Sequence, residues 1–309
     1  MKILVTGGAG FIGSHLTDQL IEAGNEVVVI DNLSTGQENN LNPNARFYKL
    51  DIRDPKISDV FKDERPEMVF HYAAQIDIRK STEDPIESAN INILGTLNVL
   101  ENCKKFGIKK IIFASSGGAI YGDAEIIPTP ENYLPFPVSP YGIEKLIAEH
   151  YLDFYKRSYG LDYLILRYAN VYGPRQNPKG EAGVVAIFAD KLLNNQIPVI
   201  NGNGAQTRDY VFVNDVVDAA MLALKTVKSK KPIFNIGTGI ETSVNNLYKI
   251  ITEEIGKNIP ANYGSAKTGE QARSCLDSSK IRKELNWQPK YKIGEGIKIT
   301  TDWFKTDEH

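Results

Sequence analysis

Short apolar runs alternate along the chain with longer stretches in which apolar residues recur every three or four positions. Six runs are rich in β-branched or aromatic residues, which is typical of buried parallel strands: 3–5, 26–31, 46–50, 68–72, 110–114 and 163–167. Helical spacing occupies 56–63, 86–106 and 141–159. Because strand and helix alternate, the pattern predicts an α/β fold with a doubly wound parallel sheet.

The pattern changes at about residue 170, where prolines and glycines predict loops. We expect helices at 184–195, 214–224, 243–256, 278–286 and 294–304, and strands at 198–200, 211–213 and 233–236. No linker separates the halves, so we expect two interleaved domains. One comprises 1–169 with about 211–239; a smaller α/β domain comprises 170–210 and 240–309.

A glycine-rich turn follows the first strand. Gly8, Gly10 and Gly13 have the spacing G-x-G-x-x-G, and Gly7 precedes them. Apolar residues then recur at helical spacing, so the glycines lie where a strand meets a helix. Such a turn lets a pyrophosphate approach the backbone at the helix N-terminus. The alternative is a turn that binds nothing.

The second strand ends in Asp31, 18 residues after Gly13. A carboxylate there accepts hydrogen bonds from both ribose hydroxyls and repels a 2′-phosphate, which favours NAD over NADP. The loop after Asp31 contains Asn32, Ser34, Thr35 and Gly36, and we expect it to close over the ribose. A Rossmann-type domain that binds NAD is therefore predicted.

Tyr141 and Lys145 lie four residues apart, on one face of a predicted helix. A free tyrosine titrates near pH 10. A nearby ammonium group, together with a cationic nicotinamide, would stabilise the phenolate and lower its pKa. The strand at 110–114 delivers Ser115 and Ser116 to its carboxyl end, where ligands bind in open α/β sheets. A tyrosine and a lysine on a solvated helix face are the alternative.

Composition excludes several classes of protein. Of the 309 residues, 42% are hydrophobic and 24% charged, and the formal charge of -2 gives no reason to expect nucleic acid or an anionic membrane as a partner. Cys103 and Cys275 are too few for a disulfide framework and lack metal-ligand spacing. No apolar run approaches a membrane span or a signal peptide. We therefore expect a cytoplasmic protein without a metal site.

Taken together, the motifs resemble the extended short-chain dehydrogenase/reductase family, and within it the UDP-glucose 4-epimerase group. They are Thr6–Gly13, Asp31–Gly36, Asp51-Ile52, His71–Gln75, Asn92–Thr96, Ser115–Gly122, Tyr141–Lys145, Arg167–Pro174, Arg208–Asp215, Asn235–Gly239, Gly269-Glu270 and Leu285–Pro289. Their order along essentially the whole chain makes the resemblance specific.

The resemblance implies a role for each matching residue. Cofactor contacts would come from Gly7, Gly10, Phe11, Ile12, Gly13, Asp31, Asn32, Ser34, Thr35, Gly36, Asp51, Ile52, Ala73, Ala74, Gln75, Asn92, Tyr141 and Lys145. Tyr141 would be the acid/base, with Lys145 tuning it and Ser116 as the hydroxyl partner. Counting back from Tyr121 reaches Gly117 instead of Ser116, and Ser115 is a second candidate. The nucleotide sugar would meet Ser116, Tyr141, Asn170, Val185, Arg208, Lys267, Glu270 and Ser274.

The implied activity is NAD-dependent epimerisation at C4 of a UDP-hexose through a 4-keto sugar, in a homodimer formed by helices 86–106 and 141–159. UDP-glucose and UDP-galactose are the expected pair. A small Ser274 would also admit UDP-GlcNAc and UDP-GalNAc. Alternatives are a UDP-glucuronate 4-epimerase, an NDP-sugar 4,6-dehydratase or decarboxylase, and a catalytically silent NAD-binding regulator. Ser115–Gly118 contains no acid to drive elimination, which disfavours the dehydratase.

Overall fold

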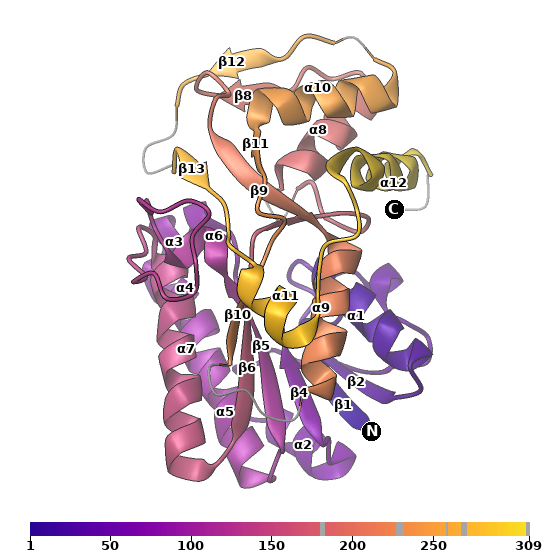
Figure 1. Ribbon diagram of the computed structural model, residues 1–309. Coiled ribbons are helices and arrows are strands. Elements are labelled where there is room, and N and C mark those ends of the chain that lie inside the picture. The colour runs from indigo at the N-terminus through magenta and orange to yellow at the C-terminus, as the bar shows by residue number, and fades with distance from the viewer. Residues whose placement is uncertain (180–182, 227–231, 258, 267–270, 307–309) are drawn as a thin grey trace.

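A parallel sheet of seven strands lies at the centre of the larger part of the molecule (Figure 1). The computed structural model describes residues 1–309 except 180–182, 227–231, 258, 267–270 and 307–309. The sheet strands are β1 (Lys2–Thr6), β2 (Glu26–Asp31), β3 (Arg46–Lys49), β4 (Met68–His71), β5 (Lys110–Ser116), β6 (Asp162–Tyr168) and β10 (Ile233–Ile236). Their order is β3-β2-β1-β4-β5-β6-β10, and neighbouring strands are parallel. The predicted fold class is confirmed.

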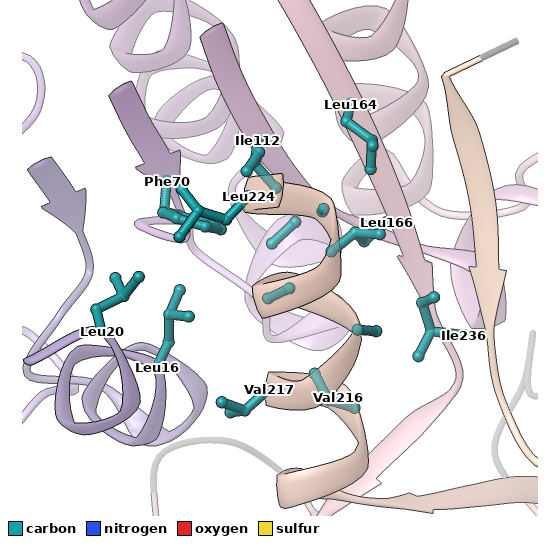
Figure 2. Close-up of a cluster of buried hydrophobic side chains, with 14 of the residues drawn as sticks. Leu16, Leu20, Phe70, Ile112, Leu164, Leu166, Val216, Val217, Leu224 and Ile236 are labelled. Atoms are coloured by element: carbon teal, nitrogen blue, oxygen red, sulfur yellow. The ribbon is translucent and has the colours of Figure 1, made fainter. Parts of the chain in front are cut away.

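Helices cover both faces of this sheet because its strands are apolar on both sides. On one face, α1 (Phe11–Glu22) and α9 (Val213–Lys225) bury Leu16, Leu20, Val216 and Val217 against Leu166 and its neighbours (Figure 2). The other face is covered by α2 (Ile57–Glu64), α5 (Gly95–Lys105) and α7 (Pro140–Tyr159). The order of strands reverses between β1 and β4, which is where ligands bind in such sheets.

A second, smaller assembly lies beyond the carboxyl ends of the large sheet (Figure 1). Its strand β9 (Thr207–Phe212) pairs with β7 (Asn170–Tyr172), β11 (Glu241–Ser243) and β13 (Arg273–Ser274), and β8 (Val199–Asn201) pairs with β12 (Asn262–Gly264). Helices α8 (Val184–Leu193), α10 (Val244–Ile255) and α12 (Ile293–Lys305) pack around them, and α11 (Ser279–Leu285) lies beside β10. The division into two functional domains stays a prediction.

The buried carboxylate of Asp209 ties this assembly to the large sheet. It lies in β9 and accepts backbone hydrogen bonds from Thr238 (2.9 Å) and Gly239 (3.1 Å), in the turn after β10. Leu276, just after β13, donates a third (3.3 Å). Three distant segments therefore share one anchor, which places Arg208 and β13 above the ends of the parallel strands.

The predicted helix over 86–106 is interrupted. The chain forms α4 (Pro85–Ala89), a π-helical turn η2 (Asn90–Leu94) and then α5. The Asn92 side chain bonds to neighbouring segments, which periodicity cannot reveal. The pattern also missed β7, β11, β12 and β13, which are too short to show any alternation, and the short helices η1 (Glu38–Asn40), α3 (Ile78–Glu83) and α6 (Gly117–Ile120).

Candidate active site

A single cavity of about 1060 Å³ runs from the carboxyl ends of the large sheet to α8 and β9. Most predicted site residues line it: Gly7, Gly10, Phe11, Ile12, Gly13, Asp31, Asn32, Ser34, Thr35, Asp51, Ile52, Ala73, Ala74, Gln75, Ser115, Ser116, Tyr141, Lys145, Asn170, Val185 and Arg208. Gly36, Asn92 and Ser274 are not part of this lining, and Lys267 and Glu270 lie outside the described residues. The fold thus gathers residues from opposite ends of the chain.

The glycine turn leaves room for a ligand at the start of α1. Gly7 has a φ of +74°, and a Cβ on it would lie 2.6 Å from the backbone nitrogen of Ala73. Gly10 is the N-cap of α1 and has no side chain to cap the helix. The first N–H groups of a helix have no acceptor within the helix, so an anion can take their hydrogen bonds. The turn therefore fits a pyrophosphate.

Asp31 lies at the end of β2 with both carboxylate oxygens held. Oδ2 accepts a hydrogen bond from the backbone N–H of Ala9 (3.0 Å), and Oδ1 accepts one from Leu33 (2.8 Å). Burial raises the pKa of Asp31, and these two bonds oppose the rise. Each oxygen keeps acceptor capacity for a ribose hydroxyl. Gly36 supports this corner from outside the cavity, since a Cβ on it would lie 2.9 Å from the carbonyl carbon of Ala9.

Asp51 and Ile52 lie at the same end of the cavity. Asn32 donates a hydrogen bond to Asp51 (2.9 Å), and Arg53 forms an ion pair with it (2.9 Å). Arg53 lowers the pKa of Asp51 to about 2. A second ion pair joins Arg53 to Glu87 of α4 (2.7 Å). This end of the cavity is therefore bounded by fixed charges.

Tyr141 lies at the start of α7 with its hydroxyl hydrogen-bonded to Ser116, the last residue of β5. Burial raises the pKa of Tyr141 to about 12, although the bond to Ser116 opposes the rise. In the chain alone, burial therefore determines the direction of the pKa shift, and the lowering expected from Lys145 together with a cationic nicotinamide stays a prediction. The phenol is neutral at pH 7 and can donate a proton.

Lys145 is buried one turn further along α7. Its Nζ donates a hydrogen bond to the Ala114 carbonyl (2.8 Å) and lies 5.8 Å from the ring centroid of Tyr141. Burial lowers the pKa of Lys145 to about 8, while Glu144 and Glu149 oppose the shift. The side chain therefore remains mostly an ammonium at neutral pH, but by a narrow margin.

The two serines at the end of β5 have different surroundings. Side chains of successive strand residues point to opposite faces. Ser115 donates a hydrogen bond to Glu149 (2.6 Å), which also accepts two from Arg167. Ser116 bonds to Tyr141 instead. The geometry therefore favours Ser116 over Ser115 as the hydroxyl beside a reacting group.

Asn92 reaches the cavity only through Gln75. Its Oδ1 accepts a hydrogen bond from the Gln75 backbone N–H (2.8 Å), and its Nδ2 donates one to the Gln75 carbonyl (2.8 Å). These bonds hold the cavity-lining segment after β4. Asn92 therefore positions this segment, and the predicted direct contact with a cofactor is not apparent.

The other end of the cavity contains Asn170, Val185 and Arg208. Val185 is the second residue of α8, whose N-cap, Gly183, has no side chain to accept hydrogen bonds from the first amides of this helix. Arg208 Nη1 donates a hydrogen bond to the Thr207 carbonyl (2.8 Å). Backbone donors and a guanidinium at one end suit a phosphorylated nucleotide.

Ser274 lies close to Gly118, at the start of α6, without lining the cavity. It pairs in register with Arg208, and a Cβ on Gly118 would lie 3.9 Å from its Oγ and 3.7 Å from Asn170 Oδ1. A Cβ on Gly117 would lie 2.6 Å from Leu276. Gly117 therefore lets the segment that follows β13 approach the end of β5.

Sequence reasoning missed several cavity residues. The hydroxyls of Tyr72 and Tyr168 hydrogen-bond each other across the sheet, and both residues line the cavity. Each lies at the carboxyl end of a parallel strand, which was the available signal. Gln176 also lines the cavity and is buried, and its Oε1 has no hydrogen-bond partner among the described residues.

Two further features bear on the chemistry. Among the described residues, no group of three His, Cys, Asp or Glu side chains could hold a metal ion. Of the helices in that part of the chain, none is long and apolar enough to cross a membrane.

The arrangement of Ser116, Tyr141 and Lys145 beside the glycine turn suits proton transfer at an alcohol next to a dinucleotide.

Comparison with known proteins agrees with this geometry. The family model described as NAD-dependent epimerase/dehydratase matches residues 3–237. A putative UDP-glucose 4-epimerase from Methanocaldococcus jannaschii is 51% identical, with 99% of each chain covered. The crystal structure of a Thermotoga maritima UDP-glucose 4-epimerase with UDP-glucose has a TM-score of 0.96 at 50% identity, covering 98% of each chain. A Thermus thermophilus UDP-glucose 4-epimerase in complex with NAD has a TM-score of 0.94 at 42% identity, covering 99% of this chain and 100% of that one.

The glycine turn yields a test of dinucleotide binding. We expect Gly7→Ala to lower the NAD content of the purified protein at least tenfold, because its Cβ would collide with the Ala73 backbone. Gly24→Ala is the matched control: its φ is +79°, but no atom lies within 4 Å of the added Cβ. Both changes carry the cost of a left-handed residue, about 1–2 kcal/mol. Equal NAD content in the two variants would refute the binding of NAD at the glycine turn.

Proposed function

The chain belongs to the NAD-dependent epimerase/dehydratase family, and from this membership we propose that it is a UDP-hexose 4-epimerase. Its substrates would be UDP-glucose and UDP-galactose, interconverted through a transient 4-keto sugar. The observation that carries the proposal is one cavity lined by Tyr141, Lys145 and Ser116, the glycine turn, and Arg208. An acid/base, a dinucleotide cradle and a nucleotide-binding end therefore open onto the same space.

The protein's own part in this reaction is to move a proton and to hold the ends of the substrate. In its phenolate form, Tyr141 would accept the proton of the 4-hydroxyl as the sugar is oxidised, and the resulting phenol would return it when the keto group is reduced. Ser116 would hydrogen-bond the same oxygen, and Lys145 would stabilise the phenolate. Arg208 and the first amides of α8 would hold the nucleotide, leaving the hexose free to turn over.

The residues present fit NAD. Gly7 allows the turn to pack against the Ala73 backbone, Gly10 leaves space for the pyrophosphate at the start of α1, and Asp31 offers acceptors for the ribose. Bound NAD would supply the acceptor for the hydride at C4 and give that hydride back on the opposite face. Because the cofactor ends each cycle as it began, these residues should keep it bound between turnovers.

The residues of the site fit the alternative functions less well than they fit epimerisation. A 4,6-dehydratase needs an acid near the leaving hydroxyl, and Ser115, Ser116, Gly117 and Gly118 provide none. A silent NAD-binding regulator needs no acid/base, yet Tyr141 and Lys145 are both buried in the cavity wall. UDP-glucuronate epimerisation would use the same catalytic groups, and the products of the assay distinguish it.

Four separate reactions test the substrate: UDP-glucose, UDP-galactose, UDP-GlcNAc and UDP-glucuronate, each incubated with the protein and no added NAD. We expect UDP-glucose and UDP-galactose to interconvert. Conversion of UDP-GlcNAc is also expected, because the small Ser274 stays outside the cavity lining and takes no space from an acetamido group. Release of CO₂ or formation of a 4-keto-6-deoxy sugar would contradict the proposal, and inert UDP-GlcNAc would contradict the role of Ser274.

Tyr141→Phe tests the acid/base. Turnover should fall about 10²–10⁴-fold, the usual contribution of general acid/base catalysis, while the NAD content stays at the wild-type level. Tyr151→Phe, ten residues along α7, is the control and should retain full activity. A Tyr141→Phe variant with near wild-type kcat would show that another group moves the proton.

We also propose a homodimer formed by α5 and α7 and a location in the reducing cytoplasm. Exposed apolar side chains on α4, η2 and α7 support the dimer, namely Ile86, Leu94, Ile143 and Phe154. Helices α5 and α7 pack side by side (Figure 1). Two free, buried cysteines support the location.

Light scattering tests the dimer. The wild type should have twice the chain mass of 34.4 kDa, and Phe154→Glu should reduce it to one chain by placing a charge in the interface. Ile240→Glu, at an exposed apolar residue away from α5 and α7, should leave the mass unchanged. A wild-type mass of one chain would refute the dimer.

A further inference from the structure

Glu144 is a buried carboxylate for which the proposed reaction has no use. It lies on α7 between Tyr141 and Lys145, is 3% exposed, and does not line the cavity. Its Oε2 accepts hydrogen bonds from Ser88 Oγ (2.8 Å) and Asn92 Nδ2 (2.6 Å). Burying a carboxylate is costly unless its partners compensate, so this side chain needs a physical reason.

The first effect of Glu144 is on the Asn92 amide. Nδ2 can donate two hydrogen bonds, and it gives one to Glu144 and one to the Gln75 carbonyl (2.8 Å). A carboxylate can only accept, so it fixes the NH₂ end of the amide toward itself. The oxygen end then accepts the Gln75 backbone N–H (2.8 Å). The carboxylate thereby holds both backbone groups of Gln75, which lines the cavity.

The helix that carries Asn92 is irregular at this residue. Asn92 lies in the π-helical turn η2, and Thr96 donates a hydrogen bond to its carbonyl (2.6 Å). Single π-helical turns inside helices are frequent at functional sites. Ser88, the second partner of Glu144, also accepts a hydrogen bond from Gln75 Nε2 (3.3 Å). Two paths therefore connect Glu144 with the same cavity-lining residue.

The second effect is electrostatic. The negative charge of Glu144 raises the pKa of both Tyr141 and Lys145. On α7, Glu149 acts on Lys145 in the same direction, but it forms a buried ion pair with Arg167 of β6 (2.6 Å). Glu144 has no such cationic partner among the hydrogen bonds described, so its charge is less compensated.

The other elements packed around Lys145 add little charge. His71 of β4 is held neutral, since burial and Lys145 lower its pKa to about 3. Asp77, the buried N-cap of α3, forms an ion pair with Arg79 (3.1 Å). The remaining charged side chains of α3, α4 and α5 are solvent-exposed, where water screens them: Lys80, Glu83, Glu87, Glu101, Lys104 and Lys105.

We propose that Glu144 is a positioning residue of the active site: its carboxylate holds the Asn92 amide against Gln75, and its charge keeps the Lys145 ammonium beside Tyr141. The electrostatic half of the proposal, the effect of the Glu144 charge on Lys145, rests on the proposed epimerase function. The other half is the clamp, by which we mean the hydrogen bonds that run from Glu144 through Asn92 to Gln75. The clamp is independent of the reaction and acts on NAD binding alone.

Two substitutions separate the two effects. Glu144→Gln keeps the volume and one acceptor oxygen but removes the charge. We expect it to retain NAD while its pH profile of kcat moves as a whole to lower pH, by roughly one unit, because Tyr141 and Lys145 both lose a neighbouring negative charge. Glu144→Ala removes the acceptor too, and should also lower the NAD content of the purified enzyme several-fold.

Asp153→Asn is the matched control, because it removes a carboxylate from the same helix at a partly exposed position. It should change neither the pH profile nor the NAD content. A Glu144→Gln profile that coincides with that of the wild type would overturn the electrostatic half. Wild-type NAD content in Glu144→Ala would overturn the clamp.

The measurements also separate this proposal from the proposed function. If the wild type converts no UDP-sugar, the epimerase function fails, and the NAD content of Glu144→Ala still decides the clamp. Circular dichroism checks that each variant is folded. If Glu144→Ala is unfolded, the NAD content of Glu144→Asp decides instead: its carboxylate is one methylene shorter, so a loss of NAD is expected and full retention would refute the clamp.

Discussion

The site depends on the burial of polar side chains along one face of α7. Tyr141, Glu144, Lys145 and Glu149 all lie on this helix and are all at most 8% exposed. Inside a protein, each such group must find a partner or pay for its lost hydration. Their partners come from three different elements: Ser116 and the Ala114 carbonyl on β5, Asn92 in the π-helical turn, and Arg167 on β6. The hydrogen bonds and the ion pair of these four side chains therefore fix the positions of the strand ends around α7.

The parallel sheet supplies the second constraint. Because its strands all point the same way, their carboxyl ends meet at one edge, where the glycine turn after β1, Asp31 after β2, Gln75 after β4 and Ser116 on β5 come together. The Asp209 anchor then brings β9 and β13 over this edge. One half of the cavity is thus formed by the carboxyl ends of the sheet strands. The other half is formed by segments that the buried carboxylate of Asp209 holds over them.

Much of this was predictable from sequence, because it is encoded locally. The long strands and helices have clear periodicity, and the glycine turn, Asp31 and the Tyr141/Lys145 pair have specific spacings. The parts that were not predictable depend on contacts between segments far apart in the chain. Asn92 lies in a π-helical turn and hydrogen-bonds Gln75, Tyr72 meets Tyr168 across the sheet, and burial raises the pKa of Tyr141 although a lysine is nearby. Short strands such as β13 form only because β9 offers them an edge.

The central claim is that a resident dinucleotide takes a hydride from the sugar and returns the same hydrogen, while Tyr141 moves only the proton on oxygen. Epimerisation in D₂O tests it most directly, with the product examined by NMR at C4. The account predicts that C4 keeps its original protium through many turnovers, because hydride bound in the cavity does not exchange with solvent. Deuterium at C4 would contradict it, since that would require removal of the C4 hydrogen as a proton.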